Sequence, residues 1–264
     1  MSFLEIKNIH HTYFSPKTAT TALENITLSI EEGEFISFLG PSGCGKTTLL
    51  SIIAGLLEPT EGTIKIDGIN VNQQKSMIGY MLQQDYLFPW KTIEENITLG
   101  LKIMKKNTAE NHKKTLDLLK EMNLENVEKK YPRELSGGMR QRVALVRTLS
   151  TNPKILLLDE PFSALDYQTK LKLEDLVFQI LKEYHKTALL VTHDIGEAIA
   201  MSDRIFLLKA NPGEIAQIFI VPEELNGITP FKARQHPKFS ELFQTIWEEL
   251  NNLESKTTEQ SSSP

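Results

Sequence analysis

The stretch Gly40-Pro41-Ser42-Gly43-Cys44-Gly45-Lys46-Thr47 decides how the chain is organised. It lies between the apolar run Phe35–Leu39 and a helical pattern over residues 48–57. The G-x-x-x-x-G-K-T spacing lets successive backbone N–H groups point inward, and the following helix adds the positive end of its dipole. Lys46 is placed to bridge outer phosphates, and the Thr47 hydroxyl to ligate Mg²⁺. The stretch predicts a phosphate-binding loop rather than an accidental glycine-rich turn.

Composition places the chain among soluble α/β proteins. Its 264 residues are 40% hydrophobic and 24% charged, enough for one large domain and a small appendage. No apolar run approaches the roughly 18 residues of a membrane span, and the first residues lack a signal-peptide pattern, so we expect a cytosolic chain. The net charge of −5 argues against nucleic acid as the main partner. The single cysteine, Cys44, excludes an intramolecular disulfide and is expected to fill the loop.

The N-terminal part predicts an antiparallel element. Residues 3–9 and 23–30 alternate apolar with polar, as half-buried strands do, and the Asp67-Gly68 pair predicts a tight hairpin. Tyr13 lies between the two strands. Its ring fits either stacking on a purine or plain packing.

Polar side chains follow three further predicted strands at the point where each strand ends. Gln83 follows residues 77–82, Asp159 and Glu160 follow an unbroken apolar strand, and His193 follows residues 188–191. Ligands of open α/β sheets bind outside the carboxyl ends of the strands. Taken alone, Gln83 is unremarkable and His193 fits a structural histidine. Together with the phosphate loop they supply what hydrolysis of a nucleoside triphosphate requires.

Helices are predicted between these strands. The capping-box spacing of Thr92 and Glu95 opens a helix over residues 92–105, and a second should cover 108–122. Ser136-Gly137-Gly138 opens a further helix to about residue 151, which predicts a second group of free N–H donors.

With these motifs the chain resembles an ATP-binding cassette (ABC) ATPase over about residues 4–220. The matching motifs are Walker A at residues 40–47, Walker B at Ile155–Asp159 with Glu160 after it, the signature at 135–141, the D-loop at 163–166, the A-loop aromatic Tyr13, the Q-loop Gln83 and the switch His193. The resemblance implies an α/β P-loop NTPase fold of the ABC type, with a mainly parallel core sheet, an antiparallel β subdomain and a helical subdomain.

The family pattern also implies roles for the site residues. Glu160 is expected to polarise the attacking water, with His193 and Lys46 on the γ-phosphate. Mg²⁺ is expected on Thr47 and Gln83, with Asp159 acting through water. A head-to-tail dimer is implied, in which a second copy of the chain closes on the nucleotide. The implied ATP contacts are Tyr13, Gly40, Pro41, Ser42, Gly43, Cys44, Gly45, Lys46, Thr47, Thr48 and Gln83 of one copy, and Ser136, Gly137, Gly138 and Asp166 of the other.

Residues 87–92 and the C-terminal residues 237–250 resemble importers of the nitrate, sulfonate and taurine type. In such importers a permease coupling helix contacts the segment after the Q-loop, here residues 84–95. Trp90 fits either that contact or a place in the core. The resemblance implies separate permease subunits, an indirect extracytoplasmic solute-binding protein, no nucleic acid, and a cytoplasmic position on the inner face of the membrane.

The predicted layout is an ABC ATPase domain at residues 1–222 with its helical subdomain at about 88–152. A C-terminal helical extension follows at 223–250 and a disordered tail at 251–264. Two alternatives stay open: a soluble ABC ATPase acting on nucleic acid or ribosomes, and the ATPase subunit of an exporter. The single cassette, with no repeat and no basic block, favours the importer.

Overall fold

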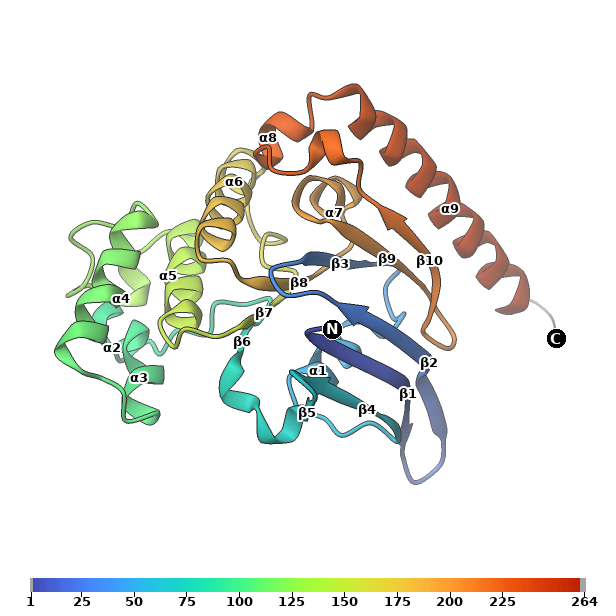
Figure 1. The fold of residues 1–264 in the computed structure, drawn as a ribbon, viewed down its shortest axis with the longest axis horizontal. Helices are drawn as coiled ribbons and strands as arrows, with labels where there is room; N and C mark the ends of the chain where they lie inside the picture. The colour runs from blue at the N-terminus through green and yellow to red at the C-terminus, as the bar shows by residue number, and fades with distance from the viewer. Residues whose placement is uncertain (1, 262–264) are drawn as a thin grey trace.

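The structure is a computed structural model that describes residues 2–261, as two sheets and their helices (Figure 1). The strands are β1 (Leu4–Phe14), β2 (Ala19–Ile30), β3 (Phe35–Leu39), β4 (Glu61–Ile66), β5 (Ile69–Asn70), β6 (Ile78–Met81), β7 (Ile155–Asp159), β8 (Thr187–Thr192), β9 (Arg204–Lys209) and β10 (Glu214–Ile220). The helices are α1 (Lys46–Ile53), α2 (Ile93–Ile97), α3 (Leu99–Ile103), α4 (Ala109–Glu121), α5 (Gly137–Leu149), α6 (Tyr167–Glu183), α7 (Ile195–Met201), α8 (Pro230–Ala233) and α9 (Pro237–Ser261). Short 3-10 turns cover Val71–Gln73, Lys75–Met77, Pro132–Glu134 and Glu223–Leu225.

The smaller sheet is antiparallel and has the order β2-β1-β4-β5. Leu4 of β1 lies opposite Ile30 of β2 on one side and Ile66 of β4 on the other. The predicted hairpin is confirmed, because Asp67 and Gly68 join β4 to β5 with positive φ angles of 49° and 75°. This sheet is the predicted antiparallel subdomain.

The larger sheet is mainly parallel, as predicted, with the order β10-β9-β3-β8-β7-β6. All neighbouring pairs from β9 to β6 run parallel, and only β10 on β9 is antiparallel. The carboxyl ends of β3, β6, β7 and β8 therefore meet at one edge. That edge carries the chemistry described below.

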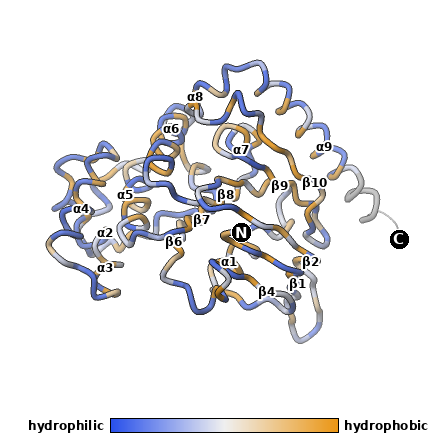
Figure 2. The backbone as a smooth tube through the Cα atoms, viewed as in Figure 1, coloured by the Kyte–Doolittle hydropathy of each residue, from blue (hydrophilic) through white to orange (hydrophobic). Residues whose placement is uncertain are grey.

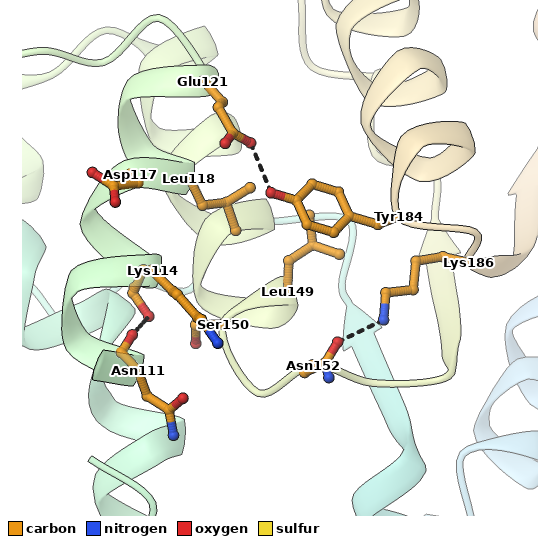
Figure 3. Close-up of a pocket in the computed structure, with 11 residues that line it drawn as sticks. Asn111, Lys114, Asp117, Leu118, Glu121, Leu149, Ser150, Asn152, Tyr184 and Lys186 are labelled. Atoms are coloured by element: carbon orange, nitrogen blue, oxygen red, sulfur yellow. Dashed lines mark hydrogen bonds between the residues drawn. The ribbon is translucent and has the colours of Figure 1, made fainter. Parts of the chain in front are cut away.

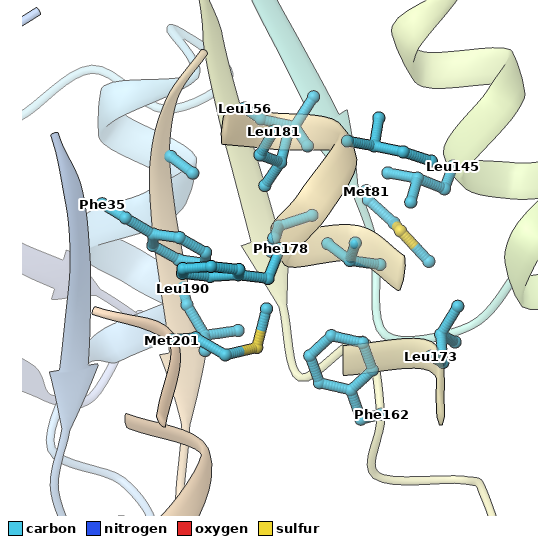
Figure 4. Close-up of a cluster of buried hydrophobic side chains, with 14 of the residues drawn as sticks. Phe35, Met81, Leu145, Leu156, Phe162, Leu173, Phe178, Leu181, Leu190 and Met201 are labelled. Atoms are coloured by element: carbon cyan, nitrogen blue, oxygen red, sulfur yellow. The ribbon is translucent and has the colours of Figure 1, made fainter. Parts of the chain in front are cut away.

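The central strands are buried on both faces. Ile155 and Leu157 of β7 belong to a cluster with α1 and the smaller sheet, whereas Leu156 and Leu158 belong to the cluster under α5, α6 and α7. Figure 4 shows side chains of α5, α6 and α7 meeting those of β6, β7 and β8 in the second cluster. This two-sided burial explains why the sequence of β7 is apolar without alternation.

The helical subdomain, α2 to α5, lies to one side of the sheets (Figure 1). The predicted capping box is confirmed, since Thr92 and Glu95 each accept the other's backbone N–H. The single helix expected over residues 92–105 is wrong. Two helices meet at Thr98, whose hydroxyl donates to the Glu94 carbonyl at 2.7 Å instead of facing solvent.

The C-terminal extension packs on the helices that cover the large sheet, α8 on α6 and α7 and α9 on α7 (Figure 1). Hydrophobic and hydrophilic residues alternate along α9 (Figure 2), and Phe239 and Ile246 are buried against the core. The disordered tail expected from residue 251 is wrong up to Ser261, because the helix continues and Leu253 still packs on the core. Residues 262–264 lie outside the described part. Between residues 2 and 261 no helix combines the length and apolar character that a membrane crossing requires.

Candidate nucleotide-binding site

The phosphate loop joins β3 to α1, as the sequence predicts. Gly45 caps α1 with φ 89°, and a Cβ there would lie 2.5 Å from the Leu23 side chain, so only glycine fits. Lys46 is buried, and its ammonium donates to the carbonyls of Gly40 at 2.7 Å and Pro41 at 2.9 Å. Cys44 is buried and burial raises the pKa of its thiol, which agrees with a loop-filling role. The lysine is thus held inside the loop whose N–H groups face an incoming anion.

Asp159, at the end of β7, lies beside the loop. Thr47 donates a hydrogen bond to its Oδ1 and Tyr80 to its Oδ2, each at 3.3 Å. Burial raises the pKa of Asp159, and the two hydroxyls oppose that rise by donating to the carboxylate. Burial and the nearby Asp159 charge raise the pKa of Tyr80 to about 12. The phenol therefore stays a hydrogen-bond donor at neutral pH.

Glu160, the next residue, has its carboxylate held by two other strand ends. Gln83 donates to Oε2 at 3.1 Å, and His193 Nδ1 lies 3.3 Å from Oε1. Glu160 has a φ of 46°, an uncommon backbone angle for a residue other than glycine. The structure thus brings Gln83, Glu160 and His193 together. Gln83 contacts Glu160 rather than Thr47, so its expected contact with Mg²⁺ remains a prediction.

Tyr13 lies beside the phosphate loop on β1. Its hydroxyl is 3.2 Å from the Thr48 hydroxyl, and 47% of the residue is exposed. His11 packs edge-on against the ring, with centroids 4.6 Å apart, and burial lowers the pKa of this histidine. A ring that is supported on one side and open on the other favours stacking over plain packing.

The signature residues lie at the start of a different helix. Ser136 caps α5 by accepting the Met139 N–H at 3.4 Å, and both Ser136 and Gly137 are exposed. Asp166 caps α6 in the same way, and its hydrogen bonds with Thr169 lower its pKa. Within residues 2–261, no hydrogen bond joins Ser136 to the phosphate loop. One copy of the chain therefore presents the two anion-binding regions separately.

A family model described as "ABC transporter" matches residues 23–163. The chain belongs to the ABC transporter family. It is 66% identical over 254 residues, 96% of this chain and 98% of the relative, to an uncharacterized ABC transporter ATP-binding protein, YtlC, of Bacillus subtilis strain 168. It is 45% identical to the aliphatic sulfonates import ATP-binding protein SsuB of Bacillus thuringiensis subsp. konkukian, over 78% of this chain and 81% of the relative.

A solved structure agrees with this assignment. The ATP-binding cassette MJ0796, in a dimeric post-hydrolysis state bound to ADP and phosphate, has a TM-score of 0.74 and 38% identity, covering 83% of this chain and 99% of that chain. The fold of this ABC ATPase is the one that the sequence predicts. The chain binds ATP and is an ATP-hydrolysing enzyme.

The donor atoms of this ABC ATPase fit Mg²⁺. Thr47 and Asp159 offer a hydroxyl and a carboxylate, the hard oxygen donors that Mg²⁺ prefers. No group of three or more His, Cys, Asp or Glu side chains in the described part of the chain forms a metal site. A Mg²⁺ ion there would be held by these two residues together with phosphate oxygens and water.

Residues missed by sequence analysis fasten the segment after the Q-loop. Asn96 is buried and makes hydrogen bonds to the backbone of Phe88, Lys91 and Thr92. Trp90 is 70% exposed, so the interpretation of this residue as core is wrong. An asparagine inside a helical pattern carries no signal of this role, because its partners are backbone groups chosen by the tertiary structure.

A second set of contacts ties the same segment to α5. Arg147 donates to the carbonyls of Asp85 at 2.7 Å and Tyr86 at 2.8 Å, Arg140 pairs with the Asp85 carboxylate at 2.9 Å, and Gln141 donates to the Gln83 carbonyl at 3.2 Å. The helix that begins at the signature therefore holds the Q-loop directly.

One large hollow lies away from this chemistry. It has a volume of about 500 Å³ between α4, the end of α5 and the loop after α6 (Figure 3). Its polar groups already have partners, because Tyr184 donates to Glu121 at 3.0 Å and Lys186 donates to Asn152 at 2.7 Å. The nucleotide site of this ABC ATPase is instead the open edge at the phosphate loop.

Proposed function

We propose that this chain is the energy-coupling subunit of an importer, hydrolysing ATP while bound to separate membrane subunits. The solute class that we propose is that of nitrate, sulfonate and taurine importers. The similarity to the sulfonate importer subunit SsuB and the sequence of residues 87–92 support this class.

The observation that carries the proposal is a segment with exposed aromatic side chains that is held at the edge of the large sheet where the carboxyl ends of the strands meet. Tyr86 is 58% exposed and lines a hollow of about 350 Å³ between residues 83–86 and α5, and Trp90, four residues further on, is 70% exposed. Exposed aromatic side chains on one segment are typical of a protein-binding surface. Because Arg147 and Gln141 hold the same segment, a permease helix seated there moves Gln83 and α5 together.

The proposed catalyst is a head-to-tail dimer. In this dimer a second copy closes on the nucleotide held by Lys46, through its Ser136, Gly137, Gly138 and Asp166. The exposed N-terminus of α5 then contacts the nucleotide of the other copy. Glu160 polarises the attacking water and His193 contacts the γ-phosphate. A bound Mg²⁺ would neutralise charge on the phosphate oxygens, and Thr47 and Gln83 would hold it, with Asp159 acting through water.

The proposed location is the inner face of the membrane, reached through the permease, with the solute-binding protein acting indirectly from outside. The alternative of an ATPase acting on nucleic acid or ribosomes is disfavoured by the net charge of −5.

The test is to copurify the chain with the membrane subunits encoded beside it and to measure its ATPase activity in proteoliposomes with the binding protein. We expect stimulation by a sulfonate, taurine or nitrate. Trp90→Ala should reduce the copurified permease, because the exposed anchor is lost. The matched control is Trp247→Ala, which removes the other tryptophan from the exposed face of α9. Stimulation by RNA or ribosomes without membrane subunits would instead support the alternative.

A further inference from the structure

Tyr80 reaches the magnesium-binding region from the neighbouring strand. In the parallel pair β6 and β7, Tyr80 lies opposite Leu157, and Asp159 follows Leu157 by two residues. Side chains two residues apart point to the same face of a sheet. Tyr80, Leu157 and Asp159 therefore share the face that α1 covers, and the Tyr80 ring packs in the cluster on that face.

Asp159 receives one hydroxyl donor on each carboxylate oxygen. Thr47 of α1 donates to Oδ1 and Tyr80 of β6 donates to Oδ2, both at 3.3 Å. Asp159 is only 6% exposed, so few solvent molecules compete for these oxygens. Two donors from two different elements fix the plane of the carboxylate, which a single donor leaves free to rotate.

The Tyr80 side chain also packs in the cluster that contains α1. The Ser51 side chain, one helical turn after Thr47, lies close enough to the phenol to oppose the rise in the pKa of Tyr80. Thr47, Asp159 and Tyr80 thus form a chain of hydrogen bonds that links α1 to the ends of β7 and β6. Any displacement of Asp159 from its place beside Thr47 breaks one of these bonds.

We propose that Tyr80 is a positioning residue for Mg²⁺, holding Asp159 so that its oxygens accept hydrogen bonds from the water shell of the ion bound at Thr47. The inference rests on the proposed magnesium role of Thr47 and Asp159. Tyr80 does not touch the ion. It acts by keeping the carboxylate in one orientation, as the outer partners of metal ligands do.

The experiment measures Mn²⁺, a spectroscopic substitute for Mg²⁺, binding to the full chain with a nonhydrolysable ATP analogue. Electron paramagnetic resonance gives the dissociation constant without any turnover. Tyr80→Phe keeps the ring and removes only the hydroxyl, so we expect Mn²⁺ to bind about three- to tenfold more weakly, the effect of one lost hydrogen bond. Binding of the analogue without metal, and the urea midpoint, should change little.

Two further variants make the result decisive. Tyr184→Phe removes a similar phenol-to-carboxylate bond, from Glu121 at 3.0 Å, and should leave the Mn²⁺ constant unchanged. Asp159→Asn should weaken Mn²⁺ binding more than Tyr80→Phe does. If Asp159→Asn weakens binding and Tyr80→Phe does not, the role of Tyr80 is overturned. If Asp159→Asn has no effect, the proposed magnesium site itself is wrong.

Discussion

Glu160 is the residue on which three strand ends converge. Its two carboxylate oxygens contact Gln83 and His193, one from the end of β6 and one from the end of β8. Glu160 has an uncommon backbone angle, and the two adjacent carboxylates have different partners. Asp159 faces the hydroxyl donors Thr47 and Tyr80, whereas Glu160 faces Gln83 and His193, the second of which contacts the γ-phosphate in the proposed mechanism.

We predict that Glu160→Gln keeps ATP binding and lowers turnover at least about 100-fold, because an amide is too weak a base to activate water. The same variant should accumulate an ATP-bound dimer, which light scattering detects. The control is Glu125→Gln, an exposed glutamate on the loop after α4, for which no change is expected. Rapid hydrolysis by Glu160→Gln would remove Glu160 from the role of base.

At the scale of elements, one buried ion pair joins the C-terminal extension to the core. Arg234, directly after α8, lies 2.7 Å from Glu174 of α6, whose side chain is fully buried. The pKa of Glu174 is raised to about 7. Burial is the main cause and the Glu197 charge adds to it, whereas the Arg234 and Lys170 charges oppose the rise. Lys170 also pairs with Glu197 at 2.5 Å and with Asp194 at 2.7 Å, beside the switch histidine.

The sign of the pH dependence follows from that raised pKa. Folded Glu174 binds its proton up to about pH 7, whereas the ordinary value is 4.5. The contribution of Glu174 to the free energy of unfolding therefore falls as the pH rises from about 4.5 to 7 and stays level above that range. The extension is thus attached most weakly at the higher pH.

We predict that Arg234→Met lowers the free energy of unfolding by about 3–5 kcal/mol at pH 8, because a buried carboxylate loses its counter-charge. The loss should be smaller at pH 5, where Glu174 is protonated. Urea unfolding at both pH values measures the difference, and Lys232→Met, an exposed cation on α8, is the control. Equal losses at pH 5 and pH 8 would contradict the assignment of the titration to Glu174.

At the scale of the whole molecule, the chain carries the two separate halves of the nucleotide site in the proposed dimer. The phosphate loop lies at the edge of the large sheet, and Ser136 lies exposed at the start of α5. The dimeric state of the similar cassette MJ0796 agrees with their meeting across two copies.

We predict that Ser136→Arg leaves ATP binding to a single copy intact and prevents closure of the dimer, since the bulky side chain blocks the N-terminus of α5. Light scattering in the Glu160→Gln background measures the dimer, and Ser240→Arg, an exposed serine on α9, controls for the added charge. Normal dimer formation by the Ser136→Arg variant would show that the site does not require the second copy.

The sequence alone determined the phosphate loop, the strand ends and the family, because these depend on local spacing. Gly45 must adopt a positive φ, and a buried strand such as β7 must be apolar throughout, so both leave marks that are readable without coordinates. The same holds for the capping box at Thr92. Such features involve residues close together in the chain.

Only the tertiary structure decided which distant groups meet. The contact of Tyr80 with Asp159 depends on the pairing of β6 with β7. The contacts of Asn96 with residues 88–92 depend on the path of the loop. The continuation of α9 to Ser261 depends on packing against the core, because the polar residues of this stretch alone do not predict a helix. The contact of Leu253 with the core stabilises it. Local propensity fixes short-range conformation, whereas packing between elements selects the long-range partners.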